Sequence, residues 1–90
     1  MDRLRTEINQ LVHPLYDLTG NSDSNIDFKD LQKLLVSRGF ELRIRGDHFI
    51  FVHQQIEEII NLQPAGHLAK PYQVRQVRSI LIKYRMAGGL

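Results

Sequence analysis

Large apolar residues recur at every second position over two short runs between positions 40 and 52, and a glycine separates the runs. The recurring residues are Phe40, Leu42 and Ile44, which alternate with Glu41, Arg43 and Arg45, and Phe49 and Phe51, which alternate with His48, Ile50 and Val52. Because successive side chains of a strand point to opposite faces, a period of two is typical of a half-buried strand. The pattern predicts strands at about 40–44 and 48–52 that meet at a tight turn containing Gly46.

Two longer segments have the spacing of amphipathic helices. The expected buried positions are Phe28, Leu31, Leu34 and Leu35 in the first, and Val74, Val77, Ile80, Leu81 and Tyr84 in the second. Asp27 is placed to cap the start of the first helix, and Gly39 is placed just past its end. Pro71 suits the first turn of the second helix, which we expect to continue to about Met86.

A third strand is expected at about 57–62, after a turn at 54–55, with Ile60 and Leu62 facing inward and Asn61 outward. Short turns between consecutive strands make the three an antiparallel meander. Two amphipathic helices that cover one face of a small sheet form a common two-layer arrangement. The sequence therefore predicts an α+β sandwich in the order helix, three strands, helix, with the second face of the sheet open.

The first part of the chain is predicted to be a separate helical extension. Its hydrophobic stripe consists of Leu4, Ile8, Leu11, Leu15 and Leu18. Pro14 interrupts the stripe, so we expect a kinked helix over about 2–18, followed by a polar loop over 20–25. This divides the chain into an extension at 1–25 and a core domain at 26–90. The extension either packs on the core or serves a partner.

The composition of the chain excludes several kinds of site. The 90 residues contain no cysteine, which excludes disulfides and thiolate metal sites, and no two histidines have the spacing of metal ligands. We therefore expect neither a metal nor a cofactor. No apolar run approaches the roughly 20 residues of a membrane helix, so we expect a cytoplasmic protein without membrane contact.

Charge is distributed unevenly along the chain. Residues 1–58 carry seven basic and ten acidic side chains, a sum of −3, whereas residues 59–90 carry five basic side chains and no acidic one, a sum of +5. A basic terminal third suits contact with phosphate groups. The alternative is that these charges only solvate a helix face.

The predicted hairpin places candidate chemistry on the open face of the sheet. If the phenylalanines face inward, then His48 points outward, and Arg43 and Arg45 share its face. Imidazole titrates near neutral pH and suits proton transfer, and guanidinium groups suit contact with a phosphodiester. We assign proton transfer to His48 and phosphate contacts to Arg43, Arg45 and Lys70. The alternative is an exposed strand histidine without a role, beside arginines that keep the sheet face soluble.

Several short motifs, in order and at matching spacing, resemble the HicA family of bacterial toxins. The motifs are Asp-Leu-Gln-Lys-Leu-Leu at 30–35, Arg-Gly-Phe at 38–40, Gly-Asp-His at 46–48, the loop into the last helix at 70–78, and Val-Arg-Ser-Ile-Leu at 77–81. The order of elements is also that of double-stranded-RNA-binding domains, which read RNA by shape and phosphate contacts.

The resemblance implies a toxin of a toxin–antitoxin pair that cleaves messenger RNA, with a fold like that of double-stranded-RNA-binding domains. It implies that His48 is the catalytic residue, that Gly46 supports the turn before it, and that a HicB-type antitoxin neutralises the protein. Asp47 departs from the family, which has serine in this turn. The aspartate places a negative charge beside the imidazole, where it either stabilises the protonated ring or repels phosphate.

Three functions follow from these residues. The first is a metal-independent endoribonuclease toxin with a single catalytic histidine. The second is an RNA-binding module that uses the same basic face without catalysis. The third is a protein–protein adaptor built on the open sheet face and the amino-terminal helix, which would have no affinity for RNA.

Overall fold

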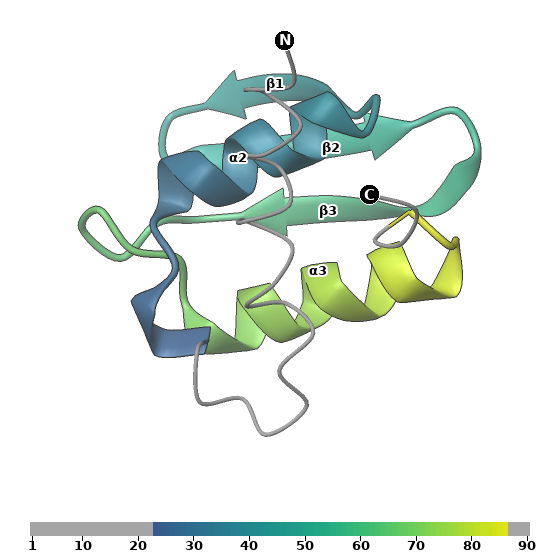
Figure 1. Ribbon diagram of the computed structural model, residues 1–90. Helices are drawn as coiled ribbons and strands as arrows, with labels where there is room; N and C mark the ends of the chain where they lie inside the picture. Colours follow the sequence, from purple (N-terminus) through teal and green to yellow (C-terminus); the bar gives the residue numbers. More distant parts are fainter. Residues whose placement is uncertain (1–22, 87–90) are drawn as a thin grey trace, which may run out of the picture.

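The computed structural model describes residues 23–86. These residues form one sheet with helices on one side. The elements are η1 (Asp23–Asn25), α2 (Phe28–Ser37), β1 (Glu41–Arg45), β2 (His48–His53), β3 (Ile56–Leu62) and α3 (Pro71–Lys83). The strands are antiparallel in the order β1-β2-β3, so β2 is central. Figure 1 shows α2 and α3 on the same side of the sheet. The predicted α+β sandwich, with its order of helix, three strands and helix, is confirmed.

Some predictions concern the ends of the chain. The kinked helix expected over 2–18 lies outside the described residues, and so does the glycine-rich tail. Residues 23–25 were expected in a loop but form the short 3₁₀ helix η1, which lies against α3. The boundary between an extension and a core at residues 25 and 26 stays a prediction.

The core lies between the helices and the inner face of the sheet. Its most deeply buried side chains are Leu31, Leu34, Leu35, Phe51, Ile60, Leu62, Val74, Val77 and Leu81. Phe51 is fully buried at the middle of the central strand, and the ring of Phe49 meets that of Phe28 edge to face at 4.8 Å between centroids. The apolar faces predicted for both helices and for the second strand are therefore the faces that pack.

Two side chains differ from their expected burial. Ile44 lies on the helix-facing side, opposite Phe49 in the register, but it is 55% exposed. It is exposed because β1 is an edge strand and Ile44 stands one residue before the turn that leaves the sheet. Arg78 is a charged residue of α3, yet its side chain is buried at 8% exposure.

Both ends of α2 are closed by the residues that the sequence predicts. At its start, the Asp27 carboxylate accepts a hydrogen bond from the Lys29 N–H at 2.9 Å. At its end, the N–H of Gly39 donates to the Val36 carbonyl at 3.0 Å, and the N–H of Phe40 donates to Leu35 at 3.1 Å. This pair of bonds is the Schellman motif, which requires a left-handed residue after the helix. Gly39 supplies it with a φ of +92°.

We expect Gly39→Ala to destabilise the fold more than Gly66→Ala does. Both glycines have positive φ, and an L-residue in the left-handed region costs about 1–2 kcal/mol. A Cβ on Gly39 would also lie 3.1 Å from Nε2 of His53, whereas nothing lies within 4 Å of a Cβ on Gly66. Urea unfolding of both variants measures the difference. Equal losses of unfolding free energy would contradict the close contact at Gly39.

The pairing of β2 with β3 contains a bulge. His53 pairs with Ile56 beside the turn, but Phe51 pairs with Ile60, so three residues of β3 stand against Val52. The shift is two residues, and therefore each side chain of β3 keeps its face. Ile60 and Leu62 are buried against the helices, and Asn61 is exposed on the open face, as predicted.

A polar cluster joins the bulged strand to the end of α3. The Glu58 carboxylate accepts a hydrogen bond from the Tyr84 hydroxyl at 2.5 Å and another from Lys83 Nζ at 2.8 Å. The bond from Lys83, and then the bond from Tyr84, lower the pKa of Glu58 from 4.5 to about 2. Between pH 4.5 and about 2, the Glu58 carboxylate is therefore still ionised in the folded protein, whereas in the unfolded chain it takes up a proton.

This cluster predicts a pH dependence of stability. Between its ordinary pKa of 4.5 and about 2, Glu58 binds more protons in the unfolded chain, so its contribution to stability is present above this interval and is lost as pH falls through it. We expect Glu58→Gln to flatten the dependence of the unfolding free energy on pH in this interval, measured by urea unfolding at a series of pH values. The control is Glu57→Gln, because Glu57 forms no ion pair within residues 23–86. An unchanged slope in Glu58→Gln would show that the cluster does not act on stability.

Candidate active site

His48 begins β2, directly after the turn that joins it to β1. Gly46 occupies the first central position of this two-residue turn with a φ of +59°, and Asp47 follows without a positive φ. Glycine at the first position with this conformation is the mark of a type II′ hairpin turn. The turn places the His48 side chain on the face of the sheet away from the helices, where it is half-exposed. The positions predicted for Gly46 and His48 are those observed.

The two arginines lie on the same face as the imidazole. Arg45 pairs directly across from His48 in the antiparallel register, and both side chains are exposed. Arg43 is also exposed, but its guanidinium lies 3.3 Å from the Glu41 carboxylate. An ion pair that solvent reaches is weak. Arg45 forms no ion pair within the described part of the chain, so it is the better placed of the two for a phosphate.

Lys70 is the N-cap residue of α3, at the end of the loop that joins β3 to this helix. Its charge helps to lower the pKa of Asp47, so its ammonium group lies within electrostatic range of the hairpin tip. No direct contact joins Lys70 to His48 within the described residues.

Asp47 and Asn61 contact different nitrogens of the imidazole. Nδ1 of His48 lies 3.2 Å from Oδ1 of Asn61, within hydrogen-bond distance. Nε2 lies 3.8 Å from Oδ1 of Asp47, which is too long for a hydrogen bond but close enough to attract a protonated ring. Asn61 was predicted to face outward, but no role was predicted for it.

A side chain that directly follows β3 holds the Asp47 carboxylate in place. Gln63 donates a hydrogen bond from Nε2 to Oδ2 of Asp47 at 2.5 Å. This bond is the main cause that holds the pKa of Asp47 below its usual value, and a backbone hydrogen bond, and then the charges of His48 and Lys70, lower it further. The carboxylate is therefore ionised at neutral pH, and it faces the imidazole as a fixed negative charge.

Gln63 is itself held by α3. The Gln73 side chain is buried at 2% exposure, and its amide nitrogen donates to the Gln63 carbonyl while its oxygen accepts from the Gln63 N–H, both at 3.0 Å. A buried amide requires such partners, because an unsatisfied polar group is costly in the interior. Sequence reasoning missed Gln73, although a glutamine at a position that faces the core was a signal.

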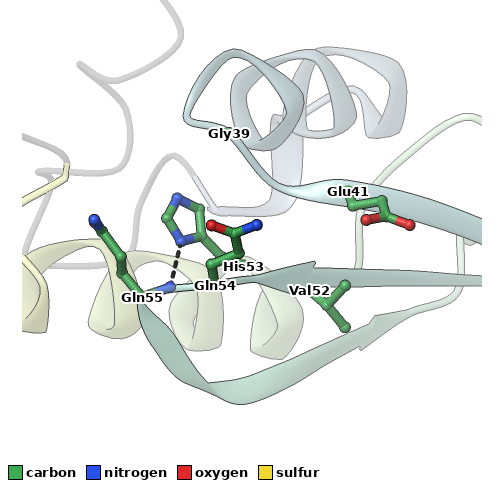
Figure 2. A pocket seen from close by; sticks show the side chains of 6 residues that line it. All are labelled: Gly39, Glu41, Val52, His53, Gln54 and Gln55. Carbon is green, nitrogen blue, oxygen red and sulfur yellow. Dashed lines mark hydrogen bonds between the residues drawn. The ribbon is translucent and has the colours of Figure 1, made fainter.

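His53 lies at the other end of β2 and on the other face. Its Nδ1 accepts a hydrogen bond from the Gln55 N–H at 3.0 Å, and its ring packs edge to face against Phe40 at 5.1 Å between centroids. Figure 2 shows this hydrogen bond beside a shallow pocket. The pocket is lined by Gly39, Glu41, Val52, His53, Gln54 and Gln55.

His53 lies five positions after His48 along an extended strand, which corresponds to about 17 Å between the two Cα atoms. The structural role predicted for His53 agrees with its contacts, and His53 is too far away to share proton transfer with His48.

Within residues 23–86, no three or more histidine, aspartate or glutamate side chains are grouped so that they could hold a metal ion. Neither α2 nor α3 has the length and apolar character that a membrane crossing requires.

The fold and the site together define a small α+β domain with one imidazole on the face of a three-stranded sheet opposite α2 and α3, and with the exposed arginines of β1 on the same face. No family model, curated protein or solved structure matches the chain.

Proposed function

We propose that the protein is a metal-independent endoribonuclease that cleaves messenger RNA, a toxin of the HicA type that acts in the bacterial cytoplasm. The observation that carries this proposal is the place of His48, half-exposed on the sheet face opposite α2 and α3 and directly across from Arg45. Double-stranded-RNA-binding domains have the same order of elements, which adds support.

The residues supply each step of a cleavage in which RNA provides the nucleophile. His48 takes the proton of a ribose 2′-hydroxyl as its oxygen attacks the adjacent phosphorus. Arg45 and Lys70 offset the negative charge that develops on the phosphoryl oxygens. The bond to the 5′-oxygen of the next nucleotide then breaks, and that oxygen takes a proton from the imidazolium or from water. The products are a 2′,3′-cyclic phosphate and a 5′-hydroxyl.

The rate of this reaction is expected to be low. A single positioned proton-transfer group accelerates a reaction by about 10²–10⁴-fold, and His53 stands too far along β2 to serve as a second one. Slow turnover is compatible with a toxin, because the damage to messenger RNA accumulates.

Hydrophobic side chains on the same face support the second part of the proposal, neutralisation by a HicB-type antitoxin. Ile59 is 64% exposed on β3, and Ile50 and Val52 are only partly buried on β2. Exposed apolar groups that lie together favour contact with another protein. A protein bound there would cover His48, so binding and inhibition would be the same event.

The test is to incubate the purified protein with an end-labelled transcript in EDTA. We expect shortened products that carry a 2′,3′-cyclic phosphate, and growth arrest when the protein is expressed in bacterial cells. Binding that weakens with salt but yields no shortened RNA would instead identify a non-catalytic RNA-binding module. Absence of both RNA binding at low salt and growth arrest would identify a protein–protein adaptor.

A further inference from the structure

The two ring nitrogens of His48 face different surroundings. Nδ1 faces the side-chain oxygen of Asn61 at 3.2 Å, and Nε2 faces the Asp47 carboxylate at 3.8 Å. In a neutral imidazole only one nitrogen carries a proton, and the hydrogen bond of one nitrogen decides which. The surroundings of His48 therefore determine which nitrogen is free to act as a base.

Asn61 favours a proton on Nδ1. With the amide oxygen turned toward the ring, as it lies in the structure, Nδ1 must be the donor of the hydrogen bond, because an amide oxygen only accepts. The other nitrogen, Nε2, then carries the lone pair. An unconstrained histidine favours the opposite tautomer, with its proton on Nε2, so the contact with Asn61 changes the state of the ring.

Asp47 is the group that could oppose the Nδ1–H tautomer. A carboxylate that accepted a hydrogen bond from Nε2–H would favour the other tautomer, and Asp47 is the carboxylate beside Nε2. The structure keeps it out of hydrogen-bond distance, since its other oxygen is bound by Gln63 and the Gln63 backbone is held by buried Gln73. At 3.8 Å the carboxylate can still stabilise the positive charge of the ring once Nε2 has taken a proton.

We propose that Asn61 is a positioning residue that fixes His48 in the Nδ1–H tautomer, so that Nε2 is the base of the proposed reaction. This inference rests on the proposed function only for its effect on cleavage. The tautomer itself is a property of the free protein and is measurable without RNA.

The measurement is the nitrogen-15 NMR spectrum of the His48 ring, recorded about two pH units above the ordinary imidazole pKa of about 6.5. We expect the wild-type protein to be mainly Nδ1–H, and Asn61→Leu to be mainly Nε2–H. Asn61→Asp keeps an oxygen acceptor and should keep the Nδ1–H form. Glu57→Leu is the matched control, because it places the same side chain on the same exposed face of β3 and should leave the ring unchanged.

Cleavage by the same variants gives a second readout. We expect Asn61→Leu to reduce the rate about three- to tenfold, which is the effect of one hydrogen bond, and Asn61→Asp to restore most of it. A wild-type ring in the Nε2–H form, or an Asn61→Leu ring unchanged from wild type, would overturn the inference. Absence of cleavage by the wild-type protein, with the expected tautomers, would overturn the proposed function and leave the role of Asn61 in the ring state standing.

Discussion

Replacement of His48 by alanine should reduce RNA cleavage about 10²–10⁴-fold, because the variant lacks the group that takes the proton from the 2′-hydroxyl. The imidazole is half-exposed, and its polar partners within residues 23–86 are Asn61 and Asp47, so its removal should leave the fold intact. The measurement is the initial rate of cleavage of an end-labelled transcript, with circular dichroism to verify folding.

Two controls separate catalysis from binding. His48→Ala should keep its RNA affinity and the salt dependence of that affinity, since Arg45 and Lys70 remain. His67→Ala removes a different exposed histidine from the loop before α3, and it should cleave at the wild-type rate. Undiminished cleavage by His48→Ala would reject His48 as the catalytic residue.

Replacement of Phe51 by alanine should reduce the free energy of unfolding by about 3–5 kcal/mol. Phe51 is fully buried on the central strand, between neighbours on both sides and beneath the helices. A domain of this size is stable by only about 5–13 kcal/mol, so the variant should lose a large part of its stability. Urea unfolding followed by circular dichroism measures the loss.

The matched control for Phe51 is Ile59→Ala on the neighbouring strand. Ile59 is 64% exposed on the face of the sheet opposite α2 and α3, so its truncation should change stability by less than about 0.5 kcal/mol. Comparable losses in the two variants would mean that the open face is as well packed as the inner one, and the two-layer description would be wrong.

Local chemistry explains why so much of the fold could be predicted. Alternation in the hairpin, helical spacing on either side, the Asp27 cap and the Gly39 stop each depend on a few neighbouring residues. The same alternation placed His48, Arg43 and Arg45 on one face, as observed. The ends of β2 and β3 differ from the predicted ends by one residue, because pairing beside the turn begins at His53 and Ile56.

Other features depend on contacts between distant residues, and the sequence did not reveal them. The bulge opposite Val52 shifts the register by two residues, and no local signal distinguishes it from a regular hairpin. Ile44 has the pattern of a buried strand residue, but its exposure depends on how far the helices extend over an edge strand. The hydrogen bonds from Gln73 to Gln63, and from Gln63 to Asp47, join three segments that only the folded chain brings together.

Hydrogen bonds connect the first turn of α3 to the tip of the β1–β2 hairpin: the Gln73 side chain binds the Gln63 backbone, and the Gln63 side chain binds Asp47. Any distortion that displaces the start of this helix would release Gln63, loosen the carboxylate of Asp47 and disturb the ring beside it. A structural change at the start of α3 would therefore alter the surroundings of the His48 imidazole without any contact to the sheet face that carries this ring.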